Sequence, residues 1–355
     1  MCFVYLSTGT GSFHEVLPFI NDILRFDSLS IVGLEKNTGK TECLKYVLER
    51  LPVDTKRIAV TSIGIDGETV DQVTRTQKPE IVLREGMFFG TSETHYRQRR
   101  LVSELIDVSD ESTSLGRVVT AKALTGGKIL LSGPSSASSL RRWMSEMRNA
   151  SIDLVIIDGA LSRMSSASPA VSQSMILATG AAYSANMTTL VSKTAHVVDL
   201  VNLDLTSQQN INRLMPLEKG VWFIDKEGNL NGLDAATSLA KDIHFEGMDD
   251  CVTLYVAGAL VDGFLEKVRK NKQLKQVELV VRDFTKVFAT PQQFRLFLKA
   301  GGRIRVLQKS KLIAVTVNPT SPSGYVLDSD ILCGRLNEAI GLPVYDLMKN
   351  KQQCN

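Results

Sequence analysis

The sequence predicts an α/β protein with a mostly parallel β-sheet flanked by helices. A glycine-containing segment at residues 33–41 follows a short apolar run and precedes an amphipathic helix. Apolar runs and helical patterns then alternate along the chain, which is typical of parallel strands joined by helices. With 355 residues, 43% of them hydrophobic, the chain is long enough to bury a substantial core in one or two domains.

Residues 1–27 are expected to form an N-terminal extension. Pro18 is suited to the first turn of a helix, and apolar residues follow it at helical spacing. We expect this short helix to dock its apolar face on the main body. The apolar residues are Phe19, Ile20, Ile23, Leu24 and Phe26.

Residues 33–41 read Gly-Leu-Glu-Lys-Asn-Thr-Gly-Lys-Thr, the pattern of a phosphate-binding loop. Such a loop turns its backbone N–H groups toward phosphate oxygens, places Lys40 near the β- and γ-phosphates and offers the Thr41 hydroxyl to Mg²⁺. A nucleoside triphosphate, with ATP as the first choice, is therefore the expected ligand. The residues expected to bind it are Gly33, Lys36, Asn37, Thr38, Gly39, Lys40 and Thr41.

The context of the loop favours this interpretation, although its spacing is unusual. Leu44, Val47, Leu48 and Leu51 form one helical face, and Pro52 ends it. Five residues separate Gly33 from Gly39, where the usual pattern has four. The displaced first glycine is similar to loops of dethiobiotin synthetase-like and molybdopterin-guanine-dinucleotide accessory proteins. The alternative is a chance match in a turn rich in glycine, lysine and threonine.

Three further residues are candidates for catalysis beside Lys40. Asp158 follows the apolar run at residues 154–157, where a phosphate-binding fold places its second Mg²⁺ ligand; the alternative is a turn cap with Gly159. Asp66 lies in a glycine-flanked loop after a predicted strand at residues 57–63, and would hold Mg²⁺ or orient water, unless it is a turn aspartate. Arg163 follows Asp158 in a serine-rich segment and would stabilise charge on the γ-phosphate; the alternative is a polar surface loop.

Further strands are predicted at residues 117–124, 128–132 and 153–157, with a helix at 138–149 before the last, and we expect them to be parallel. Beyond residue 250 the alternation resumes. It predicts strands at 252–256, 277–282, 303–307 and 312–317 and helices at 261–270 and 291–299. The expected division is therefore a nucleotide-binding core at residues 28–250 and an α/β region of additional strand–helix units at residues 251–355.

Composition argues against several classes of function. The net charge is +3, and the basic cluster at Arg97, Arg99 and Arg100 is small, so a nucleic-acid partner is not expected. No apolar run reaches the length of a membrane span and no signal peptide is recognised, so the cytoplasm is the default. The five cysteines and four histidines are dispersed and form no metal-ligand spacing.

Four stretches together carry a resemblance to a known family: residues 31–41, 61–68 with Lys78 and Pro79, 157–181, and 314–325. They resemble the P-loop subunit of the lysine 5,6-aminomutase reactivase family, bacterial accessory ATPases for an adenosylcobalamin enzyme. The resemblance implies a P-loop NTPase fold and a Mg²⁺-dependent ATPase that acts as a reactivating chaperone. The implied partners are a companion reactivase subunit and a cobalamin-dependent aminomutase, and a homodimer is left open.

Two other functions remain open at this point. A small-molecule kinase or ATP-dependent ligase of the dethiobiotin synthetase kind would use Lys40, Thr41 and Asp158 in similar roles. A slow nucleotide-binding switch would use the same loop with binding as its output. The sequence contains no Asn-Lys-x-Asp motif for guanine, and it does not otherwise choose between ATP and GTP.

Overall fold

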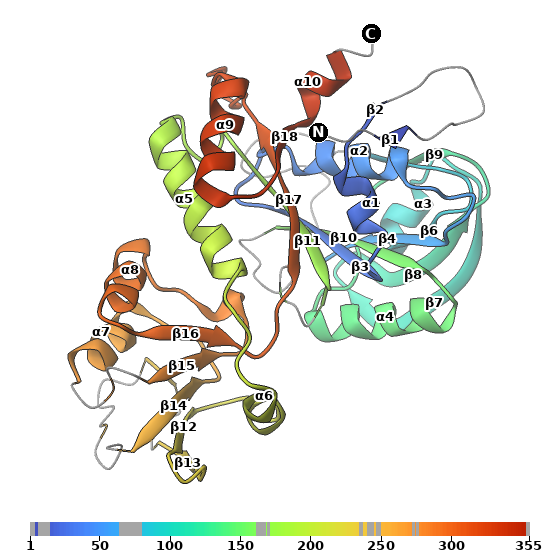
Figure 1. Cartoon of the computed structure of the whole chain (residues 1–355). Coiled ribbons are helices and arrows are strands. Elements are labelled where there is room, and N and C mark those ends of the chain that lie inside the picture. The colour runs from blue at the N-terminus through green and yellow to red at the C-terminus, as the bar shows by residue number, and fades with distance from the viewer. Residues whose placement is uncertain are drawn as a thin grey trace. The chain divides into compact units, whose positions relative to one another are not determined.

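The computed structural model describes residues 4–5, 15–63, 80–160, 168, 171–233, 237–239, 245, 250–271, 274 and 277–352. The chain divides into two compact units (Figure 1). Unit 1 comprises residues 1–194 and 311–355, and unit 2 comprises residues 195–310. The division falls within helix α5 (Met187–Val201). Across the described ranges, no helix has both the length and the apolar character that a membrane span requires.

Unit 1 contains a nine-stranded sheet in the order β18-β17-β11-β3-β10-β4-β6-β8-β7. Every neighbouring pair from β18 to β6 is parallel, whereas β8 is antiparallel to both β6 and β7. The strands are β3 (Ser28–Gly33), β4 (Ile58–Ser62), β6 (Phe88–Ser92), β7 (Ser103–Thr113), β8 (Gly116–Ala123), β10 (Leu154–Ala160), β11 (Ser174–Gly180), β17 (Lys311–Asn318) and β18 (Val344–Asp346).

Helices cover both faces of this sheet. Alternate residues of one strand enter different hydrophobic clusters, because side chains point to opposite faces of a strand in turn. Ile58 and Val60 of β4 join a cluster with α1 and α2, whereas Ala59 joins a cluster with α4. The helices of unit 1 besides α5 are α1 (Phe19–Ile23), α2 (Lys40–Arg50), α3 (Glu93–Arg97), α4 (Ala137–Asn149), α9 (Ser329–Ile340) and α10 (Leu347–Gln352).

Two short ribbons complete unit 1. Strand β1 (Val4–Tyr5) pairs antiparallel with β2 (Glu15–Val16), and β5 (Ile81–Leu83) pairs antiparallel with β9 (Gly127–Ile129). Helix α1 begins directly after Pro18, as the sequence predicts, and buries Phe19, Ile20 and Ile23. Its docking adds apolar area to the core around α2, a favourable contribution of about 25 cal/mol per Å² removed from water.

Unit 2 is a smaller α/β unit. Its five-stranded sheet has the order β13-β12-β14-β15-β16. Strands β14, β15 and β16 are parallel to one another, and β12 is antiparallel to both of its neighbours, β13 and β14. The strands are β12 (Val221–Asp225), β13 (Leu230–Gly232), β14 (Cys251–Val256), β15 (Glu278–Val281) and β16 (Arg303–Val306). The helices are α6 (Gln208–Leu214), α7 (Asp262–Lys270), η2 (Phe284–Lys286) and α8 (Pro291–Lys299).

The prediction of an α/β fold with a mostly parallel sheet flanked by helices is confirmed. Two details differ. The predicted strands at residues 117–124 and 128–132 correspond to β8 and β9, which are antiparallel to their partners. Strand β8 follows β7 through a short turn, and β9 pairs with the distant β5, so no helical crossover joins either strand to its partner. The compact units divide at residues 194 and 310, where we expected one boundary near residue 250, since β17 returns to the first sheet and pairs with β11.

Candidate functional site

The segment between β3 and α2 adopts the geometry of an anion-binding loop. Gly33 ends β3, and α2 begins at Lys40. Gly39, the N-cap of α2, has φ 90° and ψ 8°, and Asn37 has φ 61°. These left-handed conformations turn successive peptide groups so that their N–H bonds point the same way.

The backbone N–H groups of residues 37–41 find no acceptor among the described residues. No side chain caps the N-terminus of α2. In the described ranges of the chain, the N–H groups of residues 37–41 donate no hydrogen bond to protein. A helix N-terminus carries a partial positive charge and unsatisfied N–H groups, so phosphate oxygens are suitable acceptors for them.

Lys40 and Asp158 meet at the edge of the sheet where the parallel strands end. The Lys40 Nζ lies 2.9 Å from Asp158 Oδ1, with the lysine side chain 25% exposed and the aspartate side chain 19% exposed. Asp158 is on β10, which pairs with β3 in parallel register, so the two strands deliver the carboxylate and the loop to the same edge. Oδ1 is buried and accepts no hydrogen bond from any described residue, so this contact is an ion pair alone.

The end of β17 contacts the loop at residues 33–41 through Asn318. Asn318 Nδ2 donates to the Asn37 carbonyl oxygen at 3.0 Å, and Asn318 Oδ1 accepts from the Thr320 N–H at 3.1 Å. The Leu34 N–H donates to the Ala178 carbonyl oxygen of β11 at 2.9 Å. The strand order reverses beside β3, since β4 lies on one side and β11 and β17 on the other, and open α/β sheets bind ligands at such points.

The inner side of α2 carries an unreactive thiol. Cys43 is fully buried, and burial raises its pKa to about 12, with a smaller contribution in the same direction from the Asp158 carboxylate. A thiol with this pKa stays protonated and is a poor nucleophile. Cys43 therefore has a packing role.

A small pocket adjoins the loop. Its volume is about 90 Å³, and its lining includes Gly39, Glu42, Thr316, Asn318 and Met348. These residues come from the first turn of α2, the end of β17 and the start of α10. The pocket therefore lies between the first turn of α2 and the end of β17.

The structure brings together most of the predicted site residues. Gly33, Lys36, Asn37, Thr38, Gly39, Lys40 and Thr41 lie in the loop and in the first turn of α2, and Asp158 lies beside Lys40. Asp66 and Arg163 lie outside the described residues. Sequence reasoning did not assign Asn318 to the site, because nothing in the sequence places residue 318 beside residue 37.

Across the described residues, no group of three or more His, Cys, Asp or Glu side chains is placed to hold a metal ion. Mg²⁺ usually takes one or two carboxylates and fills its remaining positions with waters and substrate phosphates. Asp158 and Thr41 fit such a minimal set.

The sequence matches no family model, and neither the comparison with curated proteins nor that with solved structures found a significant match. The fold and the geometry of the site are therefore the basis for proposing a function. Unit 1 is an α/β unit with an anion-binding loop at a helix N-terminus and an ion pair at the carboxyl ends of its parallel strands.

Substituting Gly39 by alanine is expected to destabilise unit 1 by about 1–2 kcal/mol, because a residue with a Cβ is strained at this positive φ. A Cβ at this position would also lie 3.1 Å from the Asn318 Cβ. Urea unfolding in a Trp222→Phe background measures the effect, since the remaining tryptophan, Trp143, lies in unit 1.

The matched control is Gly334→Ala. Gly334 is exposed within α9, and a Cβ there would meet nothing within 4 Å, so alanine should stabilise the unit by about 0.5–1 kcal/mol. Equal unfolding midpoints for Gly39→Ala and the parent protein would contradict the role assigned to Gly39.

Proposed function

We propose that the protein is a Mg²⁺-dependent nucleoside triphosphatase of the P-loop class, with ATP as its substrate. One observation carries the proposal: the Lys40 ammonium and the Asp158 carboxylate lie 2.9 Å apart, beside the N–H groups of residues 37–41, which donate to no described residue. Phosphoryl transfer depends chiefly on positioning and on stabilising negative charge, and this arrangement supports both.

Each residue has a definite task in this proposal. The N–H groups of the loop bind phosphate oxygens, and Lys40 turns from Asp158 to the β- and γ-phosphates. Thr41 and Asp158 hold Mg²⁺, which neutralises phosphate charge when it is bound. We keep Asp66 as a further candidate for Mg²⁺ or for positioning water, and Arg163 as a candidate for stabilising the γ-phosphate.

We further propose that this ATPase reactivates an adenosylcobalamin-dependent aminomutase of the lysine 5,6-aminomutase type, together with a companion subunit. The resemblance of four stretches to the reactivase family supports this. Parts of three of them meet at one edge of the sheet, through the Leu34 bond to Ala178, the Asn318 bond to Asn37 and the Lys40 pair with Asp158. Nucleotide binding at this edge would shift the equilibrium between conformations that bind the client differently.

The test starts from an aminomutase inactivated by cobalamin that lacks its adenosyl group. It is incubated with this protein, the companion subunit, ATP, Mg²⁺ and fresh adenosylcobalamin. We expect mutase activity to recover only when ATP is present and Lys40 is intact, because reactivation requires a conformational change driven by the nucleotide.

Equal recovery with Lys40→Ala, or no recovery with all components, would overturn the reactivase proposal. Two readouts then separate the remaining alternatives. ATP consumption that requires a small-molecule acceptor would favour a kinase or ligase. Nucleotide-dependent binding to a protein partner without turnover would favour a switch.

A further inference from the structure

Strand β7 forms an open edge of the nine-stranded sheet. It runs over Ser103–Thr113 and is the last strand in the sheet order. Among the described residues its ladder partner is β8, on one side. No described strand pairs with the other side of β7, and the backbone N–H and C=O groups of such an edge can accept an added strand.

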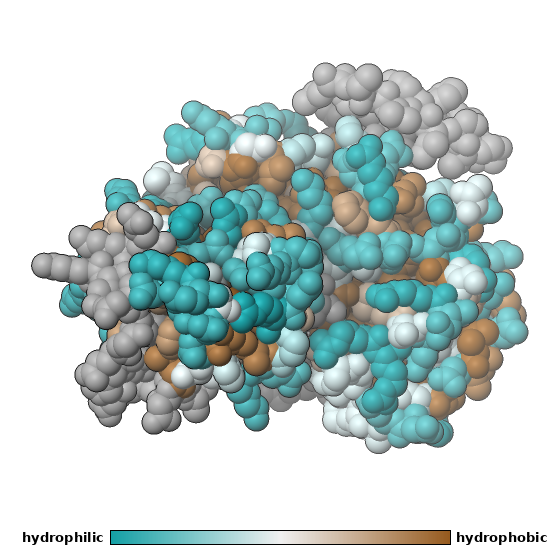
Figure 2. All heavy atoms as spheres, turned by 60° about the horizontal axis from the view of Figure 1, so that its bottom comes forward, coloured by the Kyte–Doolittle hydropathy of each residue, from teal (hydrophilic) through white to brown (hydrophobic). Residues whose placement is uncertain are grey.

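Apolar side chains are exposed along this edge. Leu105 is 54% exposed and Ile106 is 45% exposed, and Val102 and Leu124 next to the strand are also exposed. Figure 2 shows apolar surface among hydrophilic atoms along its right-hand margin, the side on which β7 and β8 lie in Figure 1. Exposed apolar surface on an unpaired edge strand is typical of an interaction site.

The charge on this edge has one sign. Residues 103–113 include four acidic and no basic residues, and Glu104, Asp107 and Asp110 are exposed. Burial raises the pKa of Glu146 on neighbouring α4, and the Asp107 carboxylate and the more distant Glu111 raise it further. Arg142 opposes this effect only in part. Strand β7 itself thus carries an excess of negative charge.

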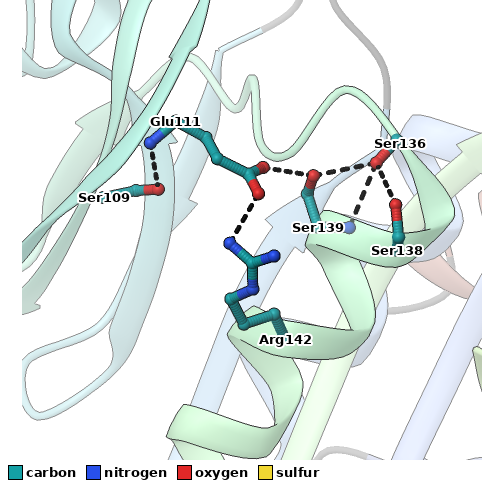
Figure 3. Close-up of polar contacts among 6 residues, drawn as sticks. All are labelled: Ser109, Glu111, Ser136, Ser138, Ser139 and Arg142. Atoms are coloured by element: carbon teal, nitrogen blue, oxygen red, sulfur yellow. Dashed lines mark hydrogen bonds and ion pairs between the residues drawn. The ribbon is translucent and has the colours of Figure 1, made fainter.

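One acidic residue of β7, Glu111, contacts side chains of α4. Glu111 Oε1 lies 2.5 Å from Arg142 Nη1, and its other oxygen accepts a hydrogen bond from Ser139 of α4 (Figure 3). The serines at the start of α4 are bonded to one another around the Ser136 N-cap. These contacts hold one side of β7 on α4, and they leave Glu104, Asp107 and Asp110 available to a partner.

We propose that β7 is a docking strand for an extended, lysine- or arginine-rich segment of a partner protein, which adds to the sheet as a further strand. Backbone hydrogen bonds would supply binding, and alternate side chains of the partner would reach the exposed carboxylates and the apolar surface. A second copy of the chain would bring a second acidic β7 against the first, and nucleic acid would be repelled. The proposal is independent of the nucleotide site.

The probe is a short synthetic peptide in which lysine and valine alternate, added to the full-length protein. Fluorescence anisotropy measures its affinity at low and at high ionic strength, and hydrogen exchange measures protection of the β7 amides. We expect saturable binding that weakens with salt, with protection of alternate amides in β7. The control peptides alternate glutamate with valine or carry N-methyl groups on alternate residues of the basic sequence.

Variants locate the binding. Asp107→Lys with Asp110→Lys should weaken the affinity for the basic peptide by about tenfold or more. The matched control, Asp54→Lys with Glu218→Lys, changes the net charge equally at exposed positions in other elements and should leave affinity within a few-fold.

A second variant tests the backbone contact. Ile106 has no partner residue in the β7–β8 register, so Ile106→Pro removes a backbone N–H without disturbing that pairing. The variant should abolish the protection of β7 amides from hydrogen exchange when the peptide is added. Equal affinity for the N-methylated peptide would show that charge alone acts, and would overturn strand addition. Absence of binding would also overturn the proposal, as would a protein dimer in which β7 of each copy becomes protected.

Discussion

Replacing Lys40 by alanine is expected to raise the dissociation constant for ATP about 30-fold or more. In the proposal the ammonium group contacts the β- and γ-phosphates, and removing one partner of a charged, desolvated contact costs about 2–5 kcal/mol. Each ~1.4 kcal/mol corresponds to a tenfold change in affinity. Titration of a fluorescent ATP analogue measures the effect, with thermal unfolding as the check that the fold is retained.

Lys45→Ala is the matched control for this variant. Lys45 lies on α2, beyond the first turn, and pairs with Glu42 on the helix surface. Its removal changes the net charge equally, without touching the loop. Unchanged affinity in Lys40→Ala, or an equal loss in both variants, would contradict the assignment of residues 33–41 as the phosphate-binding loop.

Asp158→Asn is expected to lower the kcat of Mg²⁺-dependent hydrolysis by about 100-fold or more. Loss of one charged group that stabilises the transition state has effects of this order. Affinity for ATP in the presence of Mg²⁺ should change far less, because the loop N–H groups and Lys40 keep their phosphate contacts. Steady-state hydrolysis over a Mg²⁺ series, together with the ATP titration, separates the two effects.

The ion pair adds an expectation about the same variant without Mg²⁺. Lys40 must leave Asp158 before it contacts phosphate, and asparagine holds the ammonium less strongly. ATP affinity in a metal chelator should therefore rise a few-fold in Asp158→Asn, since a partly exposed pair contributes about 1 kcal/mol. An unchanged or lower affinity would show that the pair does not restrain Lys40.

Asp153→Asn serves as the control for both measurements. Asp153 directly precedes the same strand, β10, at its opposite end, and its carboxylate bonds the Arg57 N–H and Lys56. Its substitution should leave hydrolysis and ATP binding unchanged. If Asp158→Asn hydrolyses ATP at the parental rate, the acid that acts on the metal lies elsewhere, and Asp66 is the next candidate.

Local patterns in the sequence predict individual elements well, because they depend on neighbouring residues. The predicted helix at residues 291–299 is α8, whose N-cap is the Thr290 side chain with Pro291 following, and the predicted strand at residues 252–256 is within β14. In the candidate site, loop, lysine and helix are adjacent in sequence, so the connection from strand to helix at residues 33–41 could be predicted from neighbouring residues.

Pairings between distant segments are not encoded in such patterns. The strands at residues 303–307 and 312–317 look alike in sequence, yet β16 joins the sheet of unit 2 and β17 joins the sheet of unit 1. Strand β7 was not predicted, because its exposed apolar and acidic residues give no regular alternation. Asn318 was overlooked in the site for the same reason, since its contact with Asn37 is set by strand order.

The position of unit 2 within the sequence has a consequence for synthesis on the ribosome. Strand β11 is buried along its full length and needs β17 as a neighbour, yet β17 follows residues 195–310. At about 5–20 residues per second, translating that segment takes on the order of ten seconds. During this time the nascent chain carries β11 as an apolar, unpaired edge, so unit 1 can complete its sheet only after unit 2 has been made.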